Sequence, residues 1–123
     1  MIKKIFITFV LFFCISANAV EKETNFSIEI FEEAKASGKT IVINSYEIWC
    51  GTCTKQTKIL DQAEKEFNSV LFLSFEQTKD KEIAKLLGIE YWTTVVVYKN
   101  NKEVYRSIGQ IDKTKIYSLI KSL

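Results

Sequence analysis

The feature that most constrains this chain of 123 residues is a pair of cysteines placed directly after a buried strand. Residues 41–43 form a β-branched apolar run, which is typical of a central strand, and we expect this strand to emerge into a loop at residues 44–46. The run Trp49-Cys50-Gly51-Thr52-Cys53 follows. From Cys50 onward, apolar residues recur with helical spacing. The cysteine pair is therefore predicted to lie at a strand-to-helix junction.

The helix that begins near Cys50 has a polar and an apolar face. Its apolar face is predicted to comprise Ile59, Leu60, Ala63 and Phe67. The polar residues around them are assigned to the solvated face: Thr54, Lys55, Gln56, Lys58, Asp61, Gln62, Glu64 and Lys65.

The rest of the chain alternates predicted helices and strands, and no proline, repeat or low-complexity segment interrupts it. Helical spacing predicts three further helices, at residues 27–36, 79–87 and 112–122. Apolar runs predict three further strands, at residues 70–75, 94–98 and 103–108. The last two form a hairpin through Asn100-Asn101, because Asn tolerates the positive φ of tight turns. The order predicts one α/β domain, a mixed sheet with helices on both faces.

The N-terminus has the pattern of an export signal. Lys3 and Lys4 precede an apolar run at residues 5–15, and Ala17-Asn18-Ala19 is a small-x-small cleavage pattern. This run is shorter than the roughly 20 residues that a helix needs to span a bilayer. We therefore predict a signal peptide over residues 1–19, a mature domain over residues 20–123, and a periplasmic or otherwise exported location.

Two alternatives remain for this segment, an uncleaved anchor and a lipoprotein attached through Cys14. Lipoprotein processing is expected to require small residues directly before the lipidated cysteine. Phe12 and Phe13 precede Cys14 instead, so lipidation is the weaker interpretation. Removing residues 1–19 takes away two lysines and no acidic residue, which lowers the formal charge from +2 to 0. The mature chain has no basic run, so we expect no nucleic-acid partner.

The only two cysteines of the predicted mature chain are Cys50 and Cys53. A bridge between them closes too small a loop to constrain the unfolded chain much, so stability is a poor explanation for the pair. A cysteine at a helix N-terminus can have its pKa lowered to roughly 3.5–7.5, which favours the nucleophilic thiolate. We therefore predict that Cys50 is the nucleophile of disulfide exchange and that Cys53, one turn later, resolves the mixed disulfide.

Three neighbours of the cysteines are assigned supporting roles. Gly51 allows a partner chain to approach closely, Thr52 can donate a hydrogen bond towards sulfur, and Trp49 offers an apolar wall. Ordinary packing is an equally good interpretation for Trp49 and for Trp92.

The order of elements, with W-C-G-x-C opening the second helix, resembles the thioredoxin family from about residue 26 to residue 123. Residues 95–104 look like the family's penultimate strand and hairpin, and Gly109 stands at its late glycine. The resemblance implies a thioredoxin-like fold that exchanges dithiols and disulfides with protein partners. We expect no cofactor beyond the Cys50–Cys53 pair. A reductase in an oxidising compartment needs electrons from elsewhere, so we also expect a membrane or soluble redox partner for recycling. On this likeness we expect the reductive direction, and we expect a monomer.

Three positions depart from the family pattern. Thr93 falls where thioredoxins carry a cis-proline that faces the disulfide. Some exported thioredoxin-like proteins also have a hydroxyl residue in place of this proline. A cis bond before a non-proline residue costs about 2.5–4 kcal/mol, so we expect the Trp92–Thr93 bond to be trans. The resemblance implies that Trp92 and Thr93 line the substrate groove. Tyr46 stands at a position usually held by tryptophan.

The third departure is Asn44, which falls where thioredoxins keep a buried aspartate that moves a proton to and from the second cysteine. Asn cannot do that. Glu47 could take over this role, although a lone loop carboxylate is expected to be solvated.

Two other functions remain open. Zinc requires four ligands, and the predicted mature chain has no histidine, further cysteine or methionine, but two thiolates can hold Cu(I). A redox-inactive domain could instead hold a partner near Trp49, Trp92 and Thr93. Substituting Cys50 by Ser would leave that binding intact and would abolish disulfide exchange.

Overall fold

The computed structural model describes residues 24–122, so the predicted signal peptide lies outside the described residues. The eight elements run in the order α1 (Ile28–Ala36), β1 (Ile41–Tyr46), α2 (Gly51–Glu66), β2 (Leu71–Glu76), α3 (Lys81–Leu87), β3 (Thr94–Lys99), β4 (Lys102–Ile108) and α4 (Lys113–Lys121). Within residues 24–122, no helix is long and apolar enough to cross a bilayer.

The four described strands form one mixed sheet in the order β2-β1-β3-β4. Strand β1 pairs in parallel with β2 and antiparallel with β3, and β3 forms an antiparallel hairpin with β4. The predicted α/β fold with a mixed sheet is confirmed. The sheet places the end of β1 and the start of β3 side by side, because Asn44 pairs with Val95.

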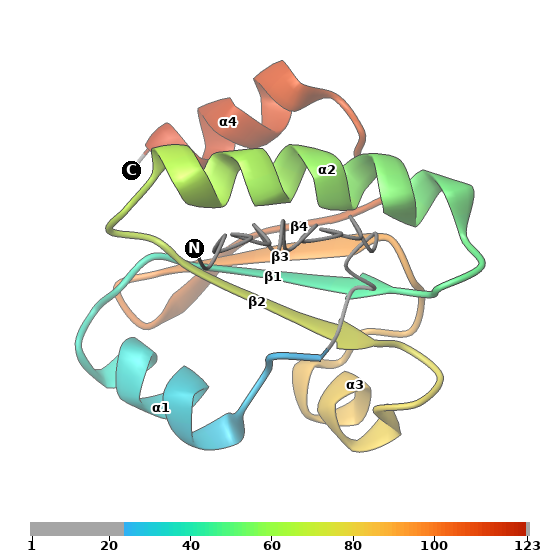
Figure 1. Cartoon of the computed structure of the whole chain (residues 1–123). Helices are drawn as coiled ribbons and strands as arrows, with labels where there is room; N and C mark the ends of the chain where they lie inside the picture. Colours follow the sequence, from blue (N-terminus) through green and yellow to red (C-terminus); the bar gives the residue numbers. More distant parts are fainter. Residues whose placement is uncertain (1–23, 123) are drawn as a thin grey trace, which may run out of the picture.

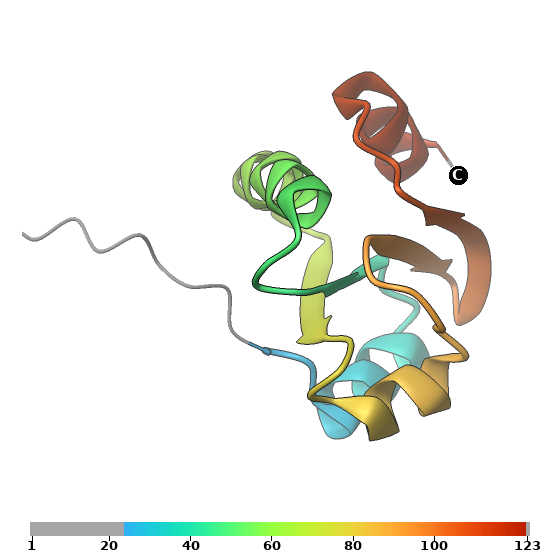
Figure 2. The same cartoon turned by 90° about the vertical axis from the view of Figure 1, so that its right-hand side faces the viewer.

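The sheet lies between two helical layers. Helices α2 and α4 cover one face and α1 and α3 cover the other, as both views show (Figures 1 and 2). The core on the α1/α3 side is built around Phe31, Ile41, Ile43, Phe75 and Leu87. The core on the α2/α4 side is built around Val42, Leu60, Val95, Ile116 and Ile120. Alternate residues of β1 thus enter opposite cores, as the period of two in a strand requires.

Local signals account for most element ends. Ser27 and Asp112 are the N-caps of α1 and α4, and their side chains accept the N–H of Ile30 and Lys115. Asn100 and Asn101 have φ angles of 51° and 66°, so the predicted tight hairpin turn is confirmed.

The prediction that residues 44–46 form a loop is wrong, because β1 continues through them. Pairing with β2 runs through to Tyr46, which lies opposite Glu76. Asn44 and Ser45 are buried despite their polar side chains. Ser45 is satisfied there because its hydroxyl donates to the carbonyl of Tyr91 at 2.8 Å and accepts the N–H of Thr94. Tertiary hydrogen bonds of this kind leave no periodic signal in the sequence.

Candidate active site

The two cysteines lie at the N-terminus of α2 and form a disulfide, with their Cα atoms 5.2 Å apart. Cys50 is the N-cap, with extended φ and ψ angles of −91° and 111°. Its Sγ accepts the backbone N–H of Cys53 at 3.1 Å, as a serine or aspartate oxygen does at an ordinary N-cap. Cys50 is 7% exposed and Cys53 only 2% exposed. A free thiolate at Cys50 would therefore meet an unpaired N–H and the positive end of the α2 dipole.

The segment before β3 faces the two sulfurs. The described residues contain no cis peptide bond, so the expected trans geometry of Trp92–Thr93 is confirmed. Thr93 is buried and has a φ of 60°, a region that β-branched residues rarely adopt. Its Oγ1 lies 3.0 Å from Cys53 Sγ and 3.6 Å from Cys50 Sγ. The structure thus places Thr93 directly against the disulfide.

Three hydrogen bonds hold the backbone of Thr93 in this conformation. Its N–H donates to the carbonyl of Ser45 at 2.9 Å. Its carbonyl accepts the N–H of Gly109 at 2.8 Å and Nε2 of Gln56 at 3.2 Å.

Gln56 is a site residue that the sequence analysis missed. We assigned it to the solvated face of α2, but it is fully buried, and its Nε2 also donates to the carbonyl of Gln110 at 2.9 Å. The available signal was its spacing, because Cys53, Gln56, Leu60 and Ala63 form the buried stripe of α2. A glutamine at such a position is buried only where backbone carbonyls are present to accept its hydrogen bonds.

The two tryptophans flank the disulfide and are not core residues. Trp49 and Trp92 are 64% and 38% exposed, and their rings meet edge to face with centroids 4.9 Å apart. Ile48 and Tyr91, the residues preceding them, are also exposed. We call Ile48, Trp49, Tyr91 and Trp92 the apolar rim.

The supporting residues Gly51 and Thr52 lie in the first turn of α2 and are both exposed. Space around Gly51 is open, since a Cβ built there would meet nothing within 4 Å. In the described part of the chain, the hydroxyl in contact with the sulfurs is that of Thr93 and not that of Thr52.

The expectation that Glu47 is solvated is wrong. Glu47 is 3% exposed, and its Oε1 accepts the backbone N–H of Thr78 at 2.7 Å, so the carboxylate anchors the loop after β2. Its backbone carbonyl accepts the N–H of Cys50, which fixes the approach to α2.

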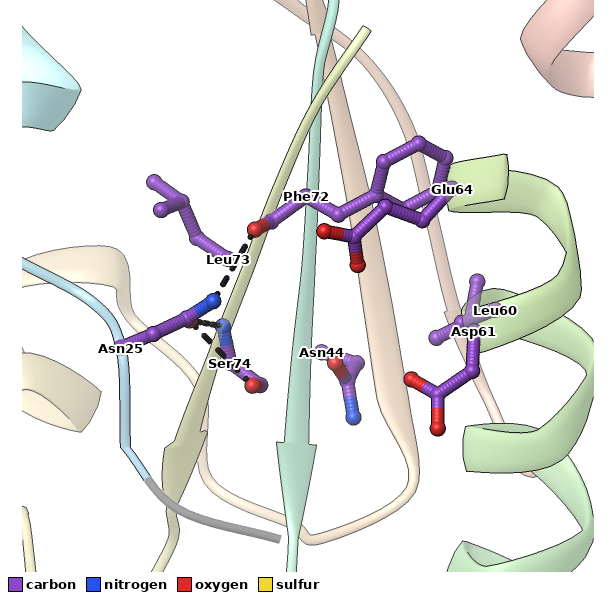
Figure 3. A pocket seen from close by; sticks show the side chains of 8 residues that line it. All are labelled: Asn25, Asn44, Leu60, Asp61, Glu64, Phe72, Leu73 and Ser74. Atoms are coloured by element: carbon purple, nitrogen blue, oxygen red, sulfur yellow. Dashed lines mark hydrogen bonds between the residues drawn. The ribbon is translucent and has the colours of Figure 1, made fainter. Parts of the chain in front are cut away.

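Asn44 is buried beneath α2, and its Nδ2 has no hydrogen-bond partner within the described chain. It lines a small cavity with room for about one water molecule. Asp61 and Glu64 of α2 lie around the same cavity (Figure 3). Among residues 24–122, no group of three or more His, Cys, Asp or Glu side chains is arranged to hold a metal ion.

A mixed sheet between two helical layers, with a C-x-x-C disulfide opening α2, defines a thioredoxin-fold protein. The family model described as Thioredoxin matches residues 18–122. Thioredoxin from Mycoplasma genitalium is 29% identical over 78% of this chain and 94% of its own length. Thioredoxin from Chlamydia caviae is 32% identical over 76% of this chain and 91% of its own length.

Solved structures agree with these sequence matches. Trxlp from Edwardsiella tarda has the same fold, with a TM-score of 0.74 at 22% identity over 79% of this chain and 96% of its own. Fasciola hepatica thioredoxin has a TM-score of 0.65 at 26% identity over 75% of this chain and 88% of its own. The chain therefore belongs to the thioredoxin family, and with its Cys50–Cys53 pair it is a thiol-disulfide oxidoreductase.

Proposed function

We propose that this protein is an exported thioredoxin-like oxidoreductase that reduces disulfides of protein partners, with Cys50 as the nucleophile and Cys53 as the resolving cysteine. The observation that carries the assignment of roles is the hydrogen bond from the Cys53 N–H to Cys50 Sγ at the start of α2. This N–H and the helix dipole stabilise negative charge on Cys50, whereas Cys53 lies deeper.

The reaction proceeds in two exchanges. The Cys50 thiolate attacks one sulfur of the partner's disulfide, so that a mixed disulfide forms and the partner's other sulfur leaves as a thiolate. Cys53 then attacks Cys50 Sγ, which closes the Cys50–Cys53 bond and releases the second partner thiolate. Two electrons pass from the enzyme dithiol to the partner, and the two protons that the dithiol loses balance those that the partner thiolates take up.

The apolar rim supports a protein partner over a small disulfide. A partner segment that reaches Cys50 must pass beside Trp49 and Trp92, whose exposed rings offer apolar contact area. Trp92 belongs, with Thr93, to the substrate groove that we predicted from the sequence.

The first experiment measures the reduction potential of the protein without residues 1–19 in glutathione or dithiothreitol buffers, with Cys50→Ser as the control. A potential near or below about −250 mV supports a reductant, and one near −120 to −180 mV supports an oxidant or isomerase and overturns the direction. A protein with no reversible couple that co-purifies with copper only when Cys50 is present would instead be a metal carrier.

Export is tested separately. We expect the full chain to be recovered outside the cytoplasm with an N-terminus at Val20, as determined by mass spectrometry of the intact protein. A cytoplasmic protein that retains residues 1–19 would contradict the signal-peptide assignment.

A further inference from the structure

We propose that the Thr93 hydroxyl is a catalytic group of the exchange reaction and donates a hydrogen bond to the Cys53 thiolate during resolution. This inference rests on the proposed function, because it concerns the step in which Cys53 attacks the mixed disulfide. The contact that carries it is the 3.0 Å distance between Thr93 Oγ1 and Cys53 Sγ.

The contact favours the thiolate of Cys53 over its two neutral forms, the thiol and the disulfide. A sulfur in a disulfide or thiol is a weak acceptor, whereas hydrogen bonds to a charged partner are roughly twice as strong as neutral ones. Thr93 and Cys53 are both buried, so little water competes for this hydrogen bond. The hydroxyl therefore stabilises the Cys53 thiolate more than either neutral form.

The hydroxyl is held in position before the reaction. The Thr93 N–H donates to the Ser45 carbonyl, and the Thr93 carbonyl accepts hydrogen bonds from Gln56 and Gly109. A left-handed φ of 60° is unfavourable for a β-branched residue, so the surrounding fold must impose it. A strained residue whose side chain touches two reacting atoms is the pattern expected of a functional position.

Two nearby side chains could otherwise exchange a proton with Cys53, but one cannot accept a proton and the other is hydrogen-bonded elsewhere. Asn44 stands at the family's buried aspartate and cannot accept a proton. The Glu47 carboxylate accepts the N–H of Thr78. The Thr93 hydroxyl, by contrast, reaches Cys53 Sγ.

The step is balanced as follows. In the mixed disulfide, the Cys53 thiol loses its proton to solvent water, and Thr93 Oγ1 donates its hydrogen to the resulting thiolate. Cys53 Sγ attacks Cys50 Sγ, the new S–S bond forms, and the bond between Cys50 and the partner sulfur breaks. The partner leaves as a thiolate that takes a proton from water, and the hydroxyl keeps its own hydrogen throughout.

The test is a single-turnover measurement of partner release from a mixed disulfide between Cys50 and a thionitrobenzoate group, across pH. Thr93→Val removes the hydroxyl at nearly constant volume, and we expect release near neutral pH to slow by roughly 10-fold or more, with the pH profile shifted to higher pH. Thr93→Ser keeps the hydroxyl and should restore most of the rate. Thr94→Val is the matched control, because the Thr94 hydroxyl donates to the Tyr91 carbonyl.

Thr93→Ala provides a second hydroxyl-free variant if Thr93→Val does not fold. Release at the wild-type rate and pH profile from a folded hydroxyl-free variant would overturn the role of Thr93. The proposed function would still stand in that case, provided that the wild-type protein exchanges disulfides. If the wild-type protein forms no mixed disulfide at Cys50, the proposed function itself is contradicted.

Discussion

The Nε2 atom of Gln56 donates to the carbonyl oxygens of both Thr93 and Gln110, at 3.2 and 2.9 Å. One side chain on α2 thus holds the segment that faces the disulfide and the segment that leads into α4. Because the same helix carries Cys50 and Cys53 in its first turn, Gln56 couples the position of Thr93 to the position of the sulfurs.

Replacing Gln56 with Leu should destabilise the protein by about 1–3 kcal/mol, because the Gln110 carbonyl loses this buried donor and the Thr93 carbonyl keeps only the N–H of Gly109. Urea unfolding of the oxidised protein measures this change. Gln62→Leu is the matched control, since Gln62 is exposed on the same helix and bonds exposed side chains. Equal free energies of unfolding for the two variants would contradict the role of Gln56.

The two cysteines should differ in reactivity once reduced. We expect iodoacetamide to modify Cys50 well below pH 8.5, the ordinary pKa of a free cysteine, because the Cys53 N–H and the α2 dipole stabilise its thiolate. Cys53 should react far more slowly, because it is almost fully buried. Mass spectrometry of peptides alkylated between pH 5 and pH 9 gives both profiles. Faster alkylation of Cys53 than of Cys50 would reverse the assigned roles.

Introducing the family's proline as Thr93→Pro should destabilise the present backbone by more than about 1 kcal/mol. Proline holds φ near −65° and has no N–H, whereas Thr93 has a φ of 60° and donates its N–H to Ser45. Urea unfolding beside Thr93→Ala, which keeps the N–H, isolates the backbone effect. If Thr93→Pro were as stable as Thr93→Ala, the segment would have adopted a different backbone conformation.

Restoring the family's aspartate as Asn44→Asp should make stability depend on pH. Burial beneath α2, with Asp61 and Glu64 around the same cavity, raises the pKa of a carboxyl at this position above its unfolded value near 3.9. The folded state then binds more protons than the unfolded state, so the variant matches the wild type in stability best below about pH 4 and loses stability as pH rises.

Relative to wild type, we expect the Asn44→Asp protein to lose more than about 1 kcal/mol between pH 4 and pH 8. Asn68→Asp, an exposed substitution of the same kind, should show no such loss. A pH-independent difference for Asn44→Asp would mean that the new carboxylate is solvated.

Removing the apolar rim should weaken docking and spare the chemistry. We expect Trp49→Ala and Trp92→Ala to raise KM for a protein disulfide roughly 2- to 10-fold with little change in kcat, because both rings are exposed and contact each other. Turnover of a small aromatic disulfide should change less. Val104→Ala, an exposed apolar substitution on β4, is the remote control, and an equal effect there would contradict a docking role.

Local signals predicted most of the fold because they depend on near neighbours in the chain. Ser27 and Asp112 were recognisable as helix starts, and Asn100-Asn101 as a turn, since caps and tight turns are set by one or two side chains. The end of β1 was mispredicted because the polar residues Asn44 and Ser45 are buried by partners distant in the sequence.

The sequence by itself determined the order of elements and the cysteine pair at the start of a helix, because these depend on periodicity and spacing along the chain. Its W-C-G-x-C motif carried the resemblance to the thioredoxin family. Only the tertiary structure decided what surrounds the sulfurs. Thr93 meets Cys53 across 40 residues, Gln56 is buried, and Glu47 faces Thr78. These contacts arise because the sheet brings the ends of β1 and β3 together beneath α2, and pairing across such distances leaves no local pattern to read.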